Sequence, residues 1–150
     1  MAISTPVYVT REEVKSALDI KETARSNGAV DRAIMLDTIA AIETGHRNVN
    51  NGSSKGVYQM MPVVRRVAGG HDRAAAMRWL DRVIADMMHA GIEVSPFNVA
   101  LVWRRGITEV RQGRVHERYY EYAVRADRLY HAYLSERTRF SSISLDSPAH

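Results

Sequence analysis

The first clear pattern in the chain is a helix with one apolar face. The spacing of apolar residues predicts a helix from about residue 29 to residue 44, and Gly45 supplies a stop signal. The apolar face is formed at i, i+4 and i+7 by Met35, Ile39 and Ile42. From Gly45 to Gly56 the chain is polar and rich in turn-forming residues, so we expect a surface loop there.

Three more helices are expected in the middle of the chain. The first is short and covers about residues 59–67. Asp72 is a typical helix cap and predicts a long helix that ends near Gly91. Its apolar stripe is expected to consist of Met77, Leu80, Ile84 and Met88. Ser95 followed by Pro96 predicts the next start, because serine caps and proline fits the first turn. This helix is expected to hold Val99, Ala100, Val102 and Trp103 and to stop at Gly106.

The end of the chain is rich in tyrosine. One turn of helix is expected over residues 108–112, followed by a final helix over residues 115–137. Its stripe alternates spacings of three and four through Tyr119, Tyr122, Ala126, Leu129 and Tyr133. Such a stripe is typical of packed core, and one member, Tyr122, can still face a substrate. We expect the serine-rich residues 138–150 to form a disordered tail.

The beginning of the chain predicts a short extension. Thr10 and Glu13 form a capping box, which predicts a helix through about Leu18. Residues 1–28 are therefore expected to be a helical N-terminal extension to one domain of residues 29–137. Only residues 7–9 have the character of a strand. The predicted fold class is all-α.

Composition narrows the possible chemistry. The 150 residues fit one compact domain. The absence of cysteine excludes disulfides, thiolate metal sites and cysteine nucleophiles. The six histidines are dispersed without zinc-ligand spacing, so we expect no metal and no other cofactor. No apolar run reaches the length of a membrane span, and residues 1–10 lack the basic-then-apolar pattern of a secretory signal.

The net charge of +4 leaves two interpretations open. Most of the excess lies late in the chain, where arginines alternate with Glu109, Glu117, Glu121 and Asp127. These arginines are Arg104, Arg105, Arg111, Arg114, Arg118, Arg125 and Arg128. They can form a solvated mixed-charge surface, or they can attract a polyanion such as cell wall or nucleic acid. Charge alone does not decide between these two.

Glu43 is the residue with the clearest catalytic potential. It stands at the end of an apolar helix, where partial burial raises the pKa of a carboxyl group. A glycosidic acid needs this property because it must carry a proton near neutral pH. Taken alone, Glu43 is better explained as a surface carboxylate at a helix end, because most carboxylates are exposed surface groups. The residues around it therefore carry the argument.

Those residues resemble the catalytic core of the soluble lytic transglycosylases, a family of the lysozyme superfamily. The resemblance begins with Glu43-Thr44-Gly45 after an apolar helix, continues through a loop with Asn and Ser, and reaches Gly56-Val57-Tyr58-Gln59-Met60-Met61-Pro62. A helix ending at Gly106, a turn at Gly113 and a final Tyr-rich helix follow in the family's order. The similarity covers about residues 33–134. It implies a lysozyme-like helical domain that cleaves peptidoglycan glycan strands and does not act on nucleic acid.

The resemblance also implies roles for individual residues. Glu43 is the single acid/base, and the product of the family carries a 1,6-anhydro ring. No Asp or Glu lies in residues 44–71, which fits a mechanism without a second carboxylate. The implied substrate-binding residues are Thr44, Ser54, Gly56, Tyr58, Gln59, Met60, Trp103 and Tyr122. Within this set, the Met60 backbone binds an N-acetyl group and the Tyr122 hydroxyl bonds to Glu43.

One departure from the family pattern bears directly on the acid. The family has a Tyr-Asn pair where this chain has Trp103-Arg104. Trp103 can still offer a surface for a sugar ring, but Arg104 cannot accept a hydrogen bond as asparagine does. An arginine near Glu43 also lowers the pKa of that carboxyl. Arg104 is therefore the residue most able to weaken catalysis.

A second resemblance supports a different class of function. Residues 8–34 are similar to the start of actinophage head-to-tail connector proteins, over about a fifth of the chain. This similarity implies a phage or prophage context, with the protein in the virion or released to the bacterial cell wall. The alternative function is a non-enzymatic virion connector or adaptor with assembly partners. Glu43 and Gln59 favour the enzyme, whereas Arg104 and the N-terminal segment favour the connector.

Overall fold

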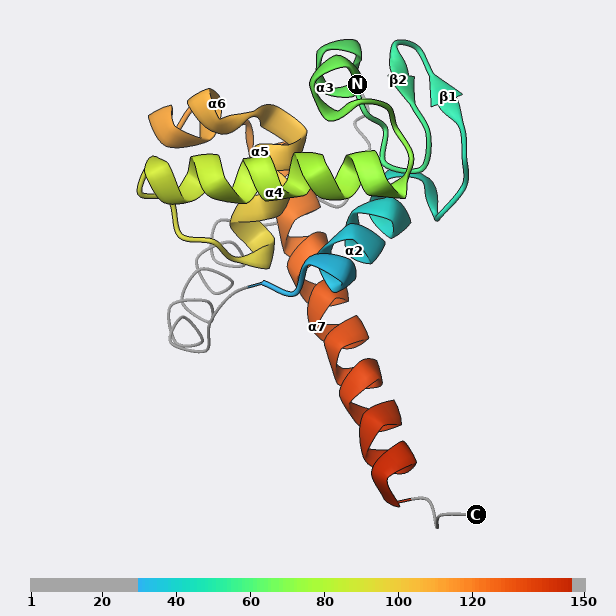
Figure 1. Ribbon diagram of the computed structural model, residues 1–150. Coiled ribbons are helices and arrows are strands. Elements are labelled where there is room, and N and C mark those ends of the chain that lie inside the picture. Colours follow the sequence, from blue (N-terminus) through green and yellow to red (C-terminus); the bar gives the residue numbers. More distant parts are fainter. Residues whose placement is uncertain (1–29, 147–150) are drawn as a thin grey trace, which may run out of the picture.

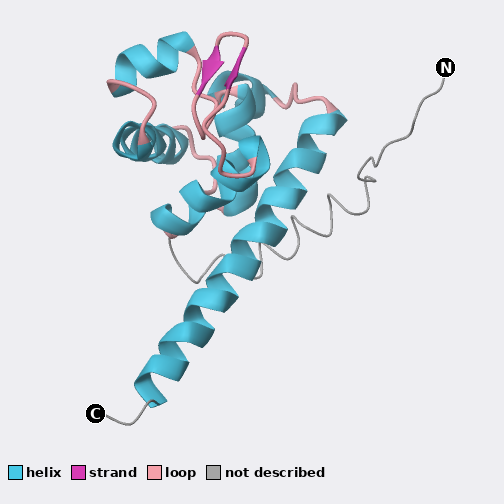
Figure 2. Cartoon of the chain, turned by 90° about the vertical axis from the view of Figure 1, so that its right-hand side faces the viewer, coloured by secondary structure: helices cyan, strands magenta, loops and turns pink. Residues whose placement is uncertain are grey.

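The computed structural model describes residues 30–146, and side chains through Arg139. The expected capping box at Thr10 and Glu13, the strand-like residues 7–9 and the extension over residues 1–28 lie outside the described residues. The described chain is mostly helical, with one small two-stranded sheet (Figures 1 and 2). The all-α class is confirmed at this level. No helix in the described part of the chain is both long enough and apolar enough to cross a membrane.

Helix α2 (Arg32–Thr44) is the expected apolar helix. The Asp31 carboxylate caps it by accepting a hydrogen bond from the Ile34 amide at 3.0 Å. Gly45 ends it in the left-handed conformation, with φ of 64°, as the sequence predicts. The buried face of α2 comprises Ile34, Met35, Leu36, Thr38, Ile39 and Ala40. The apolar spacing thus identified the correct face of this helix.

The polar loop after α2 contains a hairpin that the sequence analysis did not predict. Strand β1 (Asn50–Asn51) pairs antiparallel with β2 (Ser54–Lys55), shown as magenta strands in Figure 2. The two residues between the strands form the turn, and Gly52 there has a φ of 63°. Both strands are polar and largely exposed. Hydrophobic alternation, the usual signal of a strand, was therefore missing.

Helix α3 (Pro62–Ala68) begins later than the predicted residues 59–67. Gln59 has a φ of 50°, which is incompatible with a right-handed helix. Met60 instead forms an antiparallel bridge with Lys55, through bonds of 3.0 and 3.1 Å in the two directions. Pro62 then takes the first helical position, where a missing amide costs nothing. The prediction for this start was wrong because a backbone pairing overrode the local helical pattern.

Helices α4 (Arg73–His89) and α5 (Pro96–Arg105) begin where the sequence predicts. The Asp72 carboxylate caps α4, and the Ser95 hydroxyl caps α5 by accepting from the Asn98 amide. The predicted stripe of α4 is wrong at one end, because Met88 is 69% exposed. The buried stripe runs through Ala76, Leu80, Val83 and Met87 instead. Met88 lies one position further around the helix and faces away from the core.

Helices α6 (Ile107–Gln112) and α7 (Glu117–Asp146) complete the fold. Helix α4 lies across the body, while α7 packs against α5 and α2 and then extends beyond them (Figures 1 and 2). The buried residues of α7 are Ala123, Val124, Ala126, Asp127 and Tyr130. Helix α7 continues into the segment expected to be a disordered tail from residue 138. The physical reason is that no glycine or proline occurs between Arg114 and Pro148.

Helix α7 also holds the beginning of α2. The Asp31 amide donates a hydrogen bond of 2.8 Å to the Tyr130 hydroxyl. The Asp31 carboxylate pairs with the Arg137 guanidinium at 2.7 Å. The hydrogen bond from the Ile34 amide, and after it the bond and charge of Arg137, lower the pKa of Asp31. The first and last described helices are thereby fastened together at one end of α2.

Candidate active site

Three helices bring their side chains together around Glu43. Glu43 lies in the last turn of α2, Arg104 near the end of α5, and Tyr122 in the second turn of α7. The Glu43 side chain is only 8% exposed, whereas the Arg104 side chain is 48% exposed. The buried carboxyl therefore has a half-exposed guanidinium beside it. The expected partial burial of Glu43 is confirmed.

The two oxygens of the Glu43 carboxyl have different partners. The Tyr122 hydroxyl donates a hydrogen bond to Oε2 at 2.8 Å, the contact that the family resemblance implies. The Arg104 Nη1 atom lies 3.7 Å from Oε1. The Arg104 guanidinium also lies 5.9 Å from the centre of the Tyr122 ring, so these three residues form one group. Tyr122 holds the carboxyl at short range, and Arg104 acts mainly through its charge.

These contacts and burial act in opposite directions on the acid. Burial raises the pKa of Glu43 and is the largest influence on it. The hydrogen bond from Tyr122 and the charge of Arg104 lower the pKa, and the net result is still a raised pKa. Burial and the charge of Glu43 also raise the pKa of Tyr122 well above its usual value. Tyr122 thus remains a hydrogen-bond donor while Glu43 is kept closer to its protonated form.

Thr44 connects this helix end to the loop that follows. Its buried hydroxyl donates to the Val57 carbonyl oxygen at 2.8 Å and lies 3.2 Å from the Ala40 carbonyl oxygen. The same hydroxyl accepts a hydrogen bond from the Arg47 amide at 3.2 Å. Thr44 therefore fixes the position of the loop relative to Glu43. In this structure its hydroxyl is occupied by the protein's own backbone.

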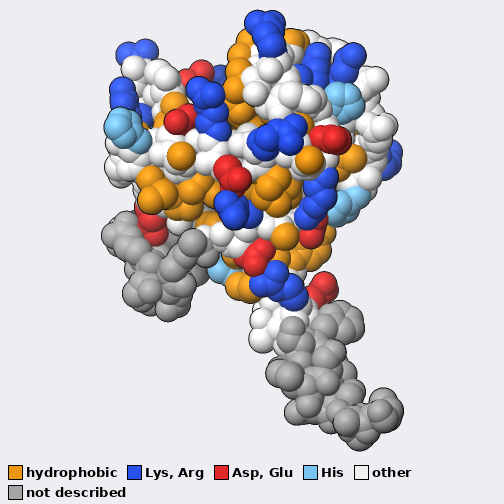
Figure 3. Space-filling view, viewed as in Figure 1, with side chains coloured by type: hydrophobic (Ala, Val, Ile, Leu, Met, Phe, Trp, Pro, Cys, Tyr) orange, Lys and Arg blue, Asp and Glu red, His pale blue; other side chains and the backbone are white. Residues whose placement is uncertain are grey.

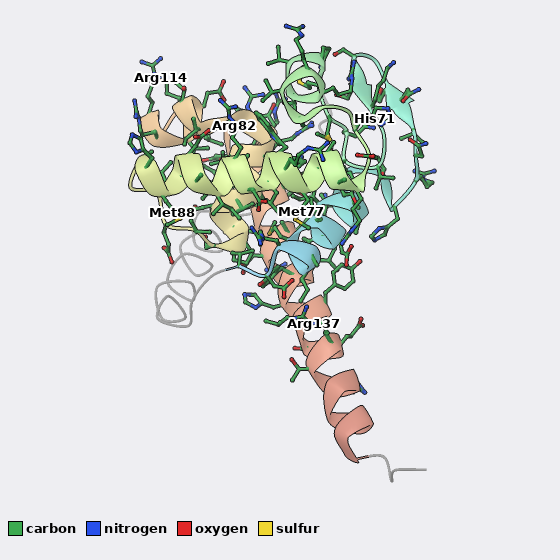
Figure 4. The ribbon with its side chains drawn as sticks, in the orientation of Figure 1. His71, Met77, Arg82, Met88, Arg114 and Arg137 are labelled. Atoms are coloured by element: carbon green, nitrogen blue, oxygen red, sulfur yellow. The ribbon has the colours of Figure 1, made fainter. Side chains whose placement is uncertain are left out.

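Gln59 and Gly56 shape the other end of the loop. The Gln59 side-chain amide donates to the carbonyl oxygens of Val49 and Gly56, at 2.9 and 2.8 Å. Gly56 is buried with a φ of 80°, and a Cβ atom there would lie 2.7 Å from His71 Nδ1. His71, labelled in Figure 4, lies beside the hairpin. The loop backbone thus approaches His71 closely, a contact for which the sequence contains no local signal.

The structure places Tyr58 and Met60 inside the protein. Tyr58 is 5% exposed, and its hydroxyl accepts a hydrogen bond from Arg73 Nη1 at 3.1 Å. Met60 is 2% exposed, and its amide already donates to the Lys55 carbonyl oxygen at 3.0 Å. The Met60 backbone, which the resemblance implies to bind an N-acetyl group, is thus paired with Lys55 within the loop. Both residues are therefore buried side chains that anchor the loop to the core.

Ser54 lies in the hairpin, and Trp103 packs against the hydrophobic core. Ser54 is partly buried in β2 and pairs with Asn51 across the hairpin. Trp103 is partly buried against the hydrophobic core. Because it directly precedes Arg104 on α5, its side chain points about 100° away around the helix. On α5, Arg104 makes the contact with Glu43.

Two further findings bear on possible chemistry. Within residues 30–146, no group of three or more His, Asp or Glu side chains is arranged to hold a metal ion. A scan against protein-family models and searches of curated proteins and of solved structures each gave no match to this chain. The geometry around Glu43 and the sequence motifs are therefore the basis for assigning a function.

Proposed function

We propose that the protein is a lysozyme-like enzyme that cleaves glycan strands of peptidoglycan. Within that class we propose a lytic transglycosylase, which cleaves the bond between N-acetylmuramic acid and N-acetylglucosamine. One observation carries this proposal: the buried Glu43 carboxyl has a raised pKa and is bonded to Tyr122 at 2.8 Å. A carboxyl of this kind suits proton delivery to a leaving oxygen. The order of motifs from Glu43 to Tyr122 adds support.

In the proposed mechanism, Glu43 acts twice. It first gives its proton to the bridging oxygen, and the bond from that oxygen to C1 of the muramic acid breaks. The C6 hydroxyl oxygen then bonds to C1, and its proton passes to the Glu43 carboxylate. The sugar closes as a 1,6-anhydro ring, and Glu43 is again protonated. No second carboxylate is needed, which fits the absence of Asp and Glu from residues 44–71.

The other residues support the acid in this proposal. Tyr122 orients the carboxyl through its short hydrogen bond and stays protonated because its pKa is raised. Thr44 and Gln59 hold the loop beside Glu43 through bonds to backbone carbonyl oxygens. Preorganised contacts of this kind favour catalysis because little rearrangement is needed during reaction. Arg104 opposes the raised pKa of Glu43 and moderates the acid.

A digest of purified peptidoglycan, analysed by mass spectrometry, tests this function. Wild-type protein should release muropeptides with anhydro ends, and Glu43→Gln should release none. Glutamine keeps an acceptor for the Tyr122 hydroxyl but cannot transfer a proton. Hydrated ends would identify a hydrolase in place of a transglycosylase. Absence of products from a folded wild-type protein would refute the enzymatic proposal.

The second candidate is a non-enzymatic virion connector or adaptor. Two observations favour it: the Arg104–Glu43 contact moderates the acid, and α7 extends beyond the other helices (Figure 2). A projecting helix offers a surface for packing against further copies. Sizing and electron microscopy of the purified protein decide between the candidates. Stable rings with no lytic activity would support the connector, whereas a lytic monomer would exclude it.

A further inference from the structure

The positive charge of the chain is concentrated between the end of α5 and the start of α7. Residues 104–118 contain five arginines and only two glutamates, and the net charge of the whole chain is +4. Arg111, Arg114 and Arg118 are exposed. Lys and Arg side chains gather along the upper edge of the surface in Figure 3, over α6 and α3. Figure 4 labels Arg114, which points outward at the end of α6. This concentration suits a polyanion.

Two of these arginines converge on one tyrosine. Arg105 Nη1 lies 3.4 Å from the Tyr119 hydroxyl, and Arg118 Nη2 lies 2.9 Å from the same oxygen. The two guanidinium groups also lie over the Tyr119 ring, at 4.5 and 4.9 Å from its centre. Like charges brought this close repel each other. An anion bound beside either group would relieve that repulsion.

The two guanidinium groups differ in how they are neutralised. Arg105 makes two contacts with the Glu109 carboxylate, at 2.9 and 3.0 Å, which is the strong bidentate arrangement. Among the ion pairs between described side chains, none involves Arg118, whose guanidinium contacts the Tyr119 hydroxyl. It also lies in the first turn of α7, where the helix dipole is positive and disfavours a cation. Arg118 is therefore the member best placed to bind an anion.

Arg105, Arg118 and Tyr119 contact one another, and the exposed Arg111 and Arg114 are close to them in sequence; we call these five residues the Arg118 cluster. We propose that the Arg118 cluster binds the phosphodiester groups of an anionic cell-wall polymer. A polyol phosphate carries one negative charge in each repeat, so several exposed arginines can engage it together. Guanidinium groups match phosphate oxygens in shape and bind them in pairs of hydrogen bonds. The choice of a wall polymer rests on the proposed function, but the phosphate chemistry rests on the cluster alone.

The geometry argues against single-stranded nucleic acid as the ligand. Proteins that bind single strands combine a basic groove with open aromatic rings on which bases stack. Here the Tyr119 ring is already covered by the guanidinium groups of Arg105 and Arg118. The cluster thus offers charge without a stacking surface. A polymer of phosphates without bases fits it better.

The cluster lies next to the group around Glu43. Arg104 and Arg105 are consecutive on α5, and Tyr119 and Tyr122 are one turn apart on α7. Arg104 contacts Glu43 and Tyr122, while Arg105 contacts Tyr119. A polymer held at Arg118 therefore lies beside the acid. Binding there would keep the enzyme at the wall between cleavage events.

Binding of fluorescently labelled poly(glycerol phosphate) to the full chain tests the proposal, measured by anisotropy at fixed ionic strength. Arg118→Gln should weaken binding about fivefold, the range expected for losing one charged contact near a surface. Arg128→Gln is the matched control, because Arg128 is exposed on the same helix about 15 Å away. It should change affinity by less than about twofold. Thermal melts confirm that both variants are folded.

Two outcomes would overturn the proposal. Equal losses in Arg118→Gln and Arg128→Gln would mean that the polymer responds only to net charge. Tighter binding of single-stranded DNA of equal length and charge would assign the cluster to nucleic acid. The result is separable from the proposed function, because this assay involves no cleavage. A protein that binds the polymer through Arg118 but yields no anhydro products would keep the site and lose the enzymatic function.

Discussion

The Tyr122 hydroxyl donates a hydrogen bond of 2.8 Å to the Glu43 carboxyl across 79 positions of sequence. This bond joins the last turn of α2 to the beginning of α7. Burial raises the pKa of the Glu43 carboxyl, and this bond lowers it. Tyr122 therefore adjusts the pKa of the carboxyl as well as its orientation. The chemistry available at Glu43 therefore depends on how α7 packs.

Tyr122→Phe should raise the pKa of Glu43 further, because it removes a hydrogen bond that favours the ionised carboxyl. In the proposed function Glu43 is a general acid, which is lost as the pH rises through its pKa, so the alkaline limb of the activity profile should move to higher pH. The free energy of unfolding should fall by about 1 kcal/mol. The pH dependence of kcat/KM and urea denaturation measure the two effects. A limb that moves to lower pH would contradict this role for Tyr122.

Arg104→Asn should also shift the alkaline limb to higher pH, because the positive charge that lowers the pKa of Glu43 is gone. The effect on stability should be below about 1 kcal/mol, since the arginine side chain is 48% exposed and screened by water. Arg128→Asn is the control, because it removes an exposed charge from a different helix, α7. Similar pH profiles for Arg104→Asn and the control would exclude Arg104 as a determinant of the acid's pKa.

Glu43→Gln should become more stable relative to wild type as the pH rises. The pKa of Glu43 is higher in the folded state than in the unfolded state. The contribution of this carboxyl to stability is therefore fully present below the unfolded pKa. It is lost as the pH rises through the folded pKa. Glutamine does not ionise and escapes this loss. Each unit between the two pKa values corresponds to about 1.4 kcal/mol. Denaturation from pH 4 to pH 8 measures the difference, and a constant difference would show that burial does not perturb Glu43.

Thr44→Val tests whether the loop is held in place by the threonine hydroxyl. The variant keeps the shape of the side chain but loses the bond to the Val57 carbonyl oxygen, and we expect about 1–2 kcal/mol of destabilisation together with reduced activity. Thr38→Val is the matched control, because Thr38 is also buried on α2 but its hydroxyl donates to the Ile34 carbonyl oxygen one turn earlier on the same helix. Equal activity in the two variants would show that the Thr44 hydroxyl is not needed to hold the loop in place for activity.

Gly56→Ala should be more destabilising than Gly52→Ala. Both glycines have a left-handed φ, which costs about 1–2 kcal/mol for any other residue. Only at Gly56 does the added methyl group also meet His71, at 2.7 Å, whereas the space at Gly52 is open. The further cost at Gly56 should be about 1–3 kcal/mol. Thermal denaturation of both variants provides the comparison, and equal losses would refute the close approach to His71.

The parts of the fold that the sequence predicts correctly are governed by local chemistry. Asp72, Ser95 and Gly45 mark helix ends because a cap needs only the residues of one turn. The start of α3 and the burial of Met88 were predicted incorrectly because both depend on distant partners. The bridge between Lys55 and Met60 moved the start of α3 to Pro62. Packing against the other helices determined that Met87, and not Met88, is buried.

The candidate site shows the same division. Burial of Glu43 follows from its position at the end of an apolar helix, and its contact with Tyr122 is implied by the family motif. The bond from Thr44 to the Val57 backbone and the approach of Gly56 to His71 had no such basis. Backbone carbonyl groups are the same in every sequence, so only the folded loop reveals which of them is used.

The contacts of Asp31 with Tyr130 and Arg137 can form only late in the synthesis of the chain. The hydrogen bond between Asp31 and Tyr130 spans 99 positions, so α2 leaves the ribosome long before its partner exists. Contacts so distant in sequence form late and slow the folding of the chain. Until α7 emerges, α2 can pack against α4 but lacks its contacts with α7. The hydrogen bond from Tyr122 to Glu43 can form only when synthesis has passed Tyr122, so a chain that ends earlier lacks this contact, which lowers the pKa of the carboxyl.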